Sequence, residues 1–77
     1  MTATDLLAAT LQAYRDVLGI AEIGAGDDFF ALGGDSMQAM DVIEILENTT
    51  GRAIPTGLFF GCPTPGELAA AVQGDAR

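Results

Sequence analysis

Residues Gly33 to Glu47 read GGDSMQAMDVIEILE, and this stretch decides the fold because it contains both a helix start and an amphipathic helix. Asp35 is the expected N-cap, since Gln38 follows three residues later and the two residues complete a capping-box pattern. The helix is therefore predicted to begin at Asp35 or Ser36 and to run to about residue 49, with Gly51 just beyond its end.

The side chains of this predicted helix divide into two faces. The apolar face is expected to join the core and consists of Ala39, Val42, Ile43 and Leu46. The second face combines flexible methionines with carboxylates and consists of Met37, Asp41, Glu44, Glu47 and Asn48, with Met40 at its edge. Methionines adapt to differently shaped partners and acids steer basic ones, so this face is a candidate partner-binding surface. An ordinary solvated face explains the acids equally well.

Three other segments complete the expected architecture. Apolar residues at helical spacing predict a first helix over residues 5–18 that ends at Gly19, with a stripe of Leu7, Leu11, Tyr14 and Leu18 widened by Leu6 and Val17. Residues 19–34 form a long loop that Phe29 and Phe30 fix to the core. A last helix is expected to begin with a capping box of Thr64 and Glu67 around Pro65, and its inward face is Leu68, Ala71 and Val72. The ordered core of this single domain is predicted to span residues 5–73, with frayed ends.

Composition excludes several functions. The chain has 77 residues, with 11 acidic residues, three Arg, no Lys and no His, for a net charge of -8. Nucleic acid is not an expected partner, because phosphate neutralisation needs clustered cations. Without His, and with Cys62 as the single Cys, the chain offers no Ser-His-Asp triad, no Cys-His pair and no ordinary zinc site. We expect Cys62 to be a buried or half-buried filler, and we expect a cytoplasmic protein without a membrane segment.

Ser36 is the candidate site for chemistry. It follows Gly33 and Gly34, which leave its approach clear, and the N–H groups of a helix start favour an attached phosphate. Asp35 opposes that attraction, and the local geometry alone favours an ordinary serine in a first helical turn. As a nucleophile Ser36 would need a general base, which a chain without His and Lys does not supply. If Ser36 reacts, another protein is expected to activate it.

The segment DDFFALGGDSM, Asp27 to Met37, closely resembles the attachment motif of thiolation domains, the peptidyl carrier proteins of nonribosomal peptide synthesis within the acyl carrier superfamily. The segments TGRAIPTGLFF (50–60) and CPTPGELAAAV (62–72) are similar to the loop, short third helix and fourth helix of these proteins. The resemblance covers most of the chain. One departure is Met37, where family members more often have Leu.

The resemblance implies an all-α fold, a right-handed bundle of three main helices plus one short helix, with a long loop between the first two. It implies that Ser36 carries 4'-phosphopantetheine, transferred from coenzyme A by a separate phosphopantetheinyl transferase that uses magnesium. Gly33, Gly34 and Asp35 match the motif around the attachment site. The domain would hold an aminoacyl or acyl group as a thioester and would not itself be an enzyme. The residues expected to bind its partners are Met37, Met40, Asp41, Glu44 and Glu47.

The expected partners beyond the transferase are enzymes of a natural-product pathway: an adenylation enzyme or acyltransferase that loads the carrier, condensation, ketosynthase or tailoring enzymes that use it, and a thioesterase. The carrier itself is expected to be a monomer. A free-standing carrier and a domain of a larger protein both fit the resemblance.

Two alternative functions stay open. A polyketide or fatty-acid type acyl carrier shares Ser36 but differs in its cargo, and the acidic second helix is more typical of this class. An unmodified helical adaptor would use the methionine and acid face without any arm. An autonomous hydrolase is the weakest alternative because the chain has no base for Ser36.

Overall fold

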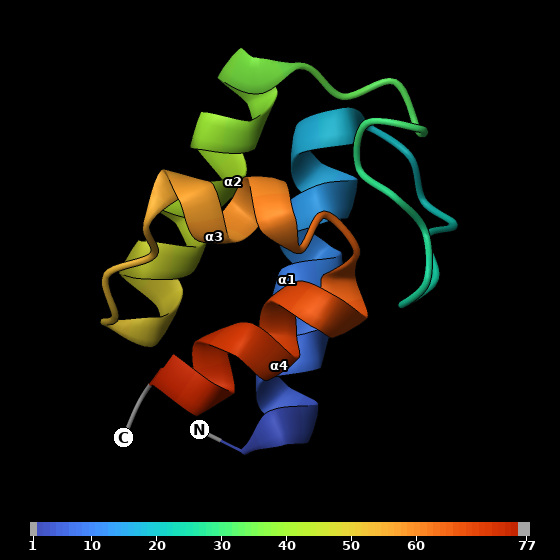
Figure 1. Ribbon diagram of the computed structural model, residues 1–77. Helices are drawn as coiled ribbons and strands as arrows, with labels where there is room; N and C mark the ends of the chain where they lie inside the picture. Colours follow the sequence, from blue (N-terminus) through green and yellow to red (C-terminus); the bar gives the residue numbers. More distant parts are fainter. Residues whose placement is uncertain (1, 76–77) are drawn as a thin grey trace.

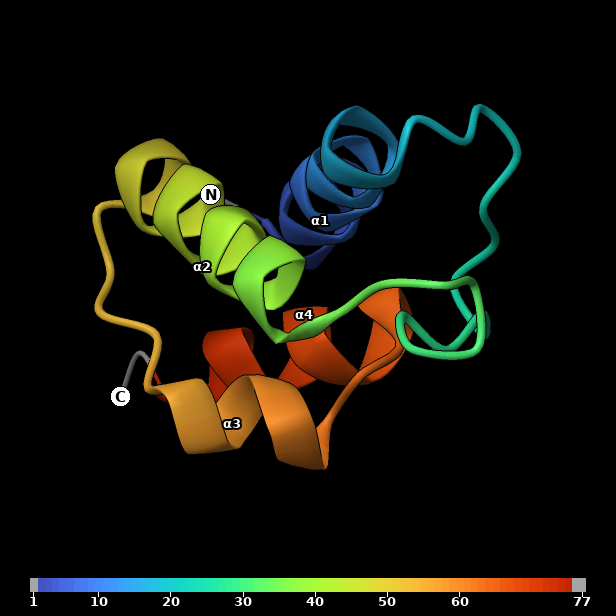
Figure 2. The same ribbon diagram turned by 90° about the horizontal axis from the view of Figure 1, so that it is seen from above.

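This computed structural model describes residues 2–75, which contain four helices joined by a long loop and two short connections (Figure 1). They are α1 (Ala3–Leu18), α2 (Ser36–Thr50), α3 (Thr56–Gly61) and α4 (Pro65–Asp75). Helices α1 and α2 run side by side in opposite directions, and α3 and α4 lie across them on one side (Figure 2). The predicted all-α bundle of three longer helices and one short helix is confirmed.

Side-chain caps place the helix starts. Asp35 caps α2 with both arms of the predicted capping box. The N–H of Glu67 donates to Thr64 Oγ1 at 3.2 Å, and the Thr64 hydroxyl donates to Glu67 Oε1 at 2.9 Å, so these two residues pair at the start of α4. Helices α1 and α2 end at Gly19 and Gly51, as predicted.

The first helix begins earlier than predicted. Thr2 is its N-cap, and it forms a capping box in which Asp5 takes the reciprocal position. The predicted helix start at Asp5 is therefore two residues too late, because an Asp at the third helical position completes the box as Glu does. At the other end α4 continues through Asp75, beyond the predicted limit at residue 73. Met1 and residues 76–77 lie outside the described residues.

The buried face of α1 is also rotated from the predicted one. Its fully enclosed residues are Leu6, Thr10, Ala13 and Tyr14. Of the predicted face, Tyr14 and Leu6, which was expected to widen the stripe, belong to this group, while Leu7, Leu11 and Leu18 are half-buried. The Thr10 hydroxyl donates to the Leu6 carbonyl at 2.7 Å, so a polar residue is accommodated on the inner face. Apolar periodicity places Thr10 on the polar side of the helix because it is not an apolar residue. The predicted buried face is therefore rotated away from the true one.

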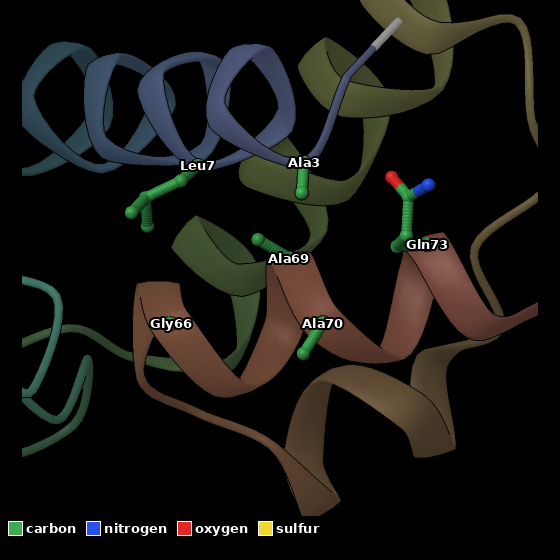
Figure 3. A pocket seen from close by; sticks show the side chains of 6 residues that line it. All are labelled: Ala3, Leu7, Gly66, Ala69, Ala70 and Gln73. Carbon is green, nitrogen blue, oxygen red and sulfur yellow. The ribbon is translucent and has the colours of Figure 1, made fainter.

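A shallow apolar hollow lies between α1 and α4 (Figure 3). Its volume is about 340 Å³, and its lining residues are Ala3, Leu7, Gly66, Ala69, Ala70 and Gln73. Most of these side chains are small, so the two helices meet here without filling the space between them. On α4 the enclosed residues are Pro65, Leu68, Ala69 and Val72, whereas Ala71 is half-buried, so the predicted inward position of Ala71 is taken by Ala69.

Helix α2 contributes its predicted apolar face to the core. Ala39, Val42, Ile43 and Leu46 are all buried, which confirms that assignment. Buried aromatic rings complete the core, with Tyr14 from α1, Phe29 from the loop and Phe59 from α3. None of the described helices is sufficiently long and apolar to cross a membrane.

The connection from α2 to α3 is held by polar contacts. The carboxylate of Glu47 accepts the N–H of Ile54 at 2.8 Å, and the Arg52 guanidinium donates to the Val72 carbonyl at 3.3 Å. Helix α3 has six residues, and its N-cap, Pro55, supplies no side-chain hydrogen bond. The position of α3 therefore depends on these contacts and on the burial of Phe59.

The Glu47 contact gives a test of this arrangement. We expect Glu47→Ala to lower the free energy of unfolding by about 1.5 kcal/mol, because the Ile54 N–H loses a charged acceptor. Glu47→Gln keeps an acceptor oxygen and should lose less. The matched control is Glu44→Ala, an exposed acid of the same helix, which should change stability by less than about 0.5 kcal/mol. Equal losses for Glu47→Ala and Glu44→Ala in urea unfolding would contradict this role.

Candidate functional site

The acids at the start of the DDFF segment close turns in the long loop. Asp27 Oδ2 accepts the N–H of Gly24 at 2.7 Å, and Asp28 Oδ1 accepts the N–H groups of Phe30 at 2.8 Å and Ala31 at 3.1 Å. Carboxylates that accept nearby backbone N–H groups stabilise turns of this kind. Sequence reasoning gave these two acids no structural role, although Asp before a tight turn is itself a signal.

Phe29 fixes the loop in the core. Its ring lies edge-on to Tyr14, with ring centres 5.1 Å apart, and edge-on to Phe59 at 5.2 Å. Its N–H donates to the Pro63 carbonyl at 3.1 Å, and the loop carbonyl of Ala25 accepts the N–H of Gly66 at 2.9 Å. The loop is thus bonded to the connection between α3 and α4 and to the first turn of α4, and the predicted role of Phe29 in fixing the loop to the core is confirmed.

The two glycines before Asp35 have separate structural reasons. Gly33 has a φ of +100°, a backbone conformation that residues with a side chain rarely adopt. Gly34 lies against the Phe29 ring, and a Cβ on it would come within 2.3 Å of a ring carbon. From the sequence, these glycines were expected to leave the approach to Ser36 clear. The structure shows that the backbone conformation of Gly33 and the Phe29 ring beside Gly34 also require glycine.

The capping box of Asp35 places Ser36. Asp35 Oδ1 accepts the Gln38 N–H at 2.8 Å, and the Asp35 N–H donates to Gln38 Oε1 at 3.1 Å. Ser36 is therefore the first helical residue of α2, and it is exposed. Within residues 2–75 no hydrogen bond occupies its hydroxyl. It is also the only serine in the chain.

This geometry suits Ser36 as an acceptor of a transferred group and not as a catalyst. The neighbouring Asp35 carboxylate is engaged by the Gln38 N–H, and the sequence contains no His or Lys to serve as a base. In the described part of the chain no group of three or more His, Cys, Asp or Glu residues could hold a metal ion. The free N–H groups at a helix start favour a phosphate attached to Ser36, so these residues fit a phosphoester.

The second face of α2 is open beside Ser36. Met37 is 80% exposed and Met40 49% exposed, and Asp41 and Glu44 are exposed as well. Glu47 differs, since it is half-buried and its carboxylate binds the Ile54 N–H. Of the residues predicted to bind partners, the first four share one accessible surface, whereas Glu47 has a structural contact of its own.

Helix α3 carries an exposed aromatic residue that sequence reasoning missed. Phe60 is 43% exposed and stacks on Phe30 with ring planes 10° apart and centres 5.4 Å apart. At the other end of α3 the Thr56 hydroxyl lies 4.0 Å from Met40 Sδ, so the two helices adjoin there. The sequence shows Leu58, Phe59 and Phe60 as one apolar group and does not reveal which of them is left exposed.

Tyr14 is a buried polar group close to the loop. Its hydroxyl donates to the Pro63 carbonyl at 2.6 Å. Burial raises the pKa of Tyr14 well above its ordinary value, and the negative charges of Asp28 and Glu67 add to this effect. The phenol therefore stays protonated and remains a donor. The nearby Cys62 is a free, half-buried thiol, as predicted.

Comparison with known proteins identifies the family. Residues 8–72 match the model of the family described as "Phosphopantetheine attachment site". Tyrocidine synthase 3 of Brevibacillus parabrevis is 42% identical over 66 residues, or 86% of this chain, and surfactin synthase subunit 3 of Bacillus subtilis is 43% identical over 53 residues, or 69%. The chain covers only 1% and 4% of the lengths of these two synthases.

Solved structures agree with this assignment. BlmI, a type-II acyl-carrier-protein from Streptomyces verticillus involved in bleomycin biosynthesis, superposes with a TM-score of 0.92 over 97% of this chain and 90% of its own, at 20% identity, a level that shows the fold. A non-ribosomal PCP domain gives a TM-score of 0.78 at 37% identity, over 91% of this chain and 90% of its own. The chain belongs to the phosphopantetheine attachment family and is related to the carrier domains of nonribosomal peptide synthetases. Its cofactor is covalently attached 4'-phosphopantetheine, as the sequence resemblance implied.

The contact between Gly34 and Phe29 can be tested by a single methyl group. We expect Gly34→Ala to lower the free energy of unfolding by about 2 kcal/mol, because the added Cβ displaces the Phe29 ring from the core. Gly26→Ala in the same loop is the control, since its Cβ would meet no atom within 4 Å and should change stability by less than about 0.5 kcal/mol. Urea unfolding of both variants decides the matter, and two equally stable variants would refute the packing argument.

Proposed function

We propose that this chain is a peptidyl or aminoacyl carrier whose Ser36 hydroxyl is the attachment point for 4'-phosphopantetheine. One observation carries the proposal: the only serine of a phosphopantetheine attachment domain is exposed at the first position of α2, and within residues 2–75 no hydrogen bond occupies its hydroxyl. When bound, the arm supplies a terminal thiol that holds acyl or aminoacyl groups as thioesters.

The residues around Ser36 define what the chain itself contributes. Asp35 holds the first turn of α2 in place, and Gly33 and Gly34 bring the loop to that turn. None of these residues supplies a base for the Ser36 hydroxyl. We therefore infer that the domain is not an enzyme and that a separate phosphopantetheinyl transferase, acting with coenzyme A and magnesium, removes the serine proton. Because the donor is coenzyme A, we expect this modification in the cytoplasm.

An adenylation enzyme is the loading partner that we propose. The support is similarity to the structure described as McyG A-PCP complexed with phenylalanyl-adenylate, with a TM-score of 0.84 over 88% of this chain and 11% of that one, at 28% identity. The surface of Met37, Met40, Asp41 and Glu44 is the proposed docking surface for this enzyme and for later condensation, tailoring or thioesterase partners. These contacts should be weak and rapidly exchanging, since a shuttle must leave one enzyme to reach the next.

The polyketide or fatty-acid type carrier is the second candidate. The exposed acids Asp41 and Glu44 favour it, because acidic second helices are more typical of that class. The two candidates differ in the loading reaction. A peptidyl carrier accepts an amino acid from an adenylation enzyme with ATP, whereas an acyl carrier accepts an acyl group from an acyltransferase.

The proposed attachment site is tested by intact mass. We expect the parent protein to gain one phosphopantetheinyl group when incubated with coenzyme A, magnesium and a broad-specificity phosphopantetheinyl transferase, and we expect Ser36→Ala to gain none. Ser36→Ala should keep the helical content of the parent in circular dichroism, because Asp35 and not Ser36 caps α2. An unmodified parent beside a modified control carrier would refute the proposal and favour the unmodified adaptor.

The docking surface is tested by charge reversal. Asp41→Lys or Glu44→Lys should lower kcat/KM for at least one partner enzyme by about threefold at low salt, with a smaller effect at high salt, because exposed acids steer basic partners. Asp16→Lys changes the net charge by the same amount on the exposed side of α1 and should leave the rate nearly unchanged. Equal rates for all variants with every cognate partner would remove the steering argument.

A further inference from the structure

The Pro63 carbonyl joins three parts of the fold. It accepts the Tyr14 hydroxyl from α1 at 2.6 Å and the Phe29 N–H from the long loop at 3.1 Å. Pro63 itself belongs to the connection between α3 and α4. Because one oxygen accepts both donors, the Tyr14 hydroxyl fixes the acceptor that holds the backbone of Phe29.

Phe29 is linked in turn to the residue two positions before Ser36. Its carbonyl accepts the N–H of Gly34 at 3.1 Å. Its ring lies so close to Gly34 that an added Cβ would come within 2.3 Å of a ring carbon. Two different contacts thus transmit the position of Phe29 to Gly34, which leads directly into the Asp35 cap of α2.

We propose that Tyr14 is a positioning residue for the modification of Ser36, acting through Pro63, Phe29 and Gly34 on the first turn of α2. This inference rests on the proposed function of Ser36 as the attachment site. Tyr14 is fully buried, so it cannot touch a partner enzyme or its substrate. Its effect is to keep the loop placed so that Asp35 caps the helix and Ser36 stays in helical conformation.

The proposed effect of Tyr14 is on the rate of Ser36 modification and not on the binding of a partner enzyme to α2. Of the proposed docking residues only Met37 adjoins Ser36, whereas Met40, Asp41 and Glu44 lie further along α2, whose inner face is held by its own buried side chains. Loosening the loop should therefore disturb the hydroxyl of Ser36 more than this surface. A displacement of about 1 Å at a reacting group can cost about a hundredfold in rate, so a partial loosening should cost about tenfold.

The experiment compares two losses of a hydroxyl from α1. Tyr14→Phe keeps the ring and removes the bond to Pro63. Thr10→Val keeps the side-chain shape and removes a buried bond of similar length, 2.7 Å, to the Leu6 carbonyl within the same helix. Thr10 has no such link to the loop, so Thr10→Val reports the effect of destabilisation alone. Urea unfolding gives the stability of both variants, and their modification by phosphopantetheinyl transferase and coenzyme A is followed by intact mass.

We expect Tyr14→Phe to lower kcat for the modification about tenfold with KM for the carrier unchanged, and Thr10→Val to keep the parent kcat. Amide hydrogen exchange supplies a readout that needs no enzyme. The N–H groups of Phe29 and Gly34 should exchange faster in Tyr14→Phe than in Thr10→Val.

The outcomes distinguish the two levels of the argument. A parent that gains no group overturns the function proposed for Ser36 and this inference with it. If the parent is modified and Tyr14→Phe is modified with the same kcat, this inference alone is overturned. A similar fall in kcat for Tyr14→Phe and Thr10→Val also overturns it, because the effect would then follow from lost stability.

Discussion

The burial of the Phe29 ring is the contact on which the other parts of this structure depend. The ring belongs to a loop and not to a helix, yet it packs against Tyr14 of α1 and Phe59 of α3 in the centre of the core. In so short a chain each buried aromatic ring is a large share of the apolar area that offsets chain entropy. The loop is therefore ordered for the same reason that the helices are packed.

This dependence explains how Ser36, the proposed attachment site, can hold a defined position at the end of a long loop. An exposed serine on a loosely held segment would sample many orientations. A modifying enzyme would then have to spend part of its binding free energy on ordering that segment. Here the ring of Phe29 abuts Gly34, and Asp35 then caps α2 with both arms of a capping box. Ser36 gains a defined position from the core while its hydroxyl stays open to solvent.

Much of this arrangement could be predicted from the sequence because it depends on local chemistry. The cap at Asp35, the helix end at Gly51 and the four core residues of α2 follow from spacing within one helix. The starting residue of α1 and the rotation of its buried face were not predicted, although they too depend on local contacts. Asp5 takes the place of the usual Glu or Gln in the Thr2 capping box, and the Thr10 hydroxyl is satisfied by the Leu6 carbonyl of the same helix. The reason for Gly34 and the exposure of Phe60 depend on tertiary contacts with Phe29 and Phe30, which no local pattern reveals.

Recognition by other proteins depends on two separate parts of this domain, the surroundings of Ser36 and the surface of methionines and acids. The sequence neighbours of Ser36 are two glycines, a capping carboxylate and the flexible Met37 side chain, and none of them is shaped to select one cargo. The hollow between α1 and α4 is lined from the first half of α1, whereas Ser36 begins α2 at the other end of the antiparallel pair (Figures 1 and 3). A surface of methionines and acids adapts to several partners, because methionine repacks easily and charge acts at a distance. We therefore expect the choice of cargo to lie with the loading enzyme, while this domain supplies one fixed attachment point and one adaptable surface.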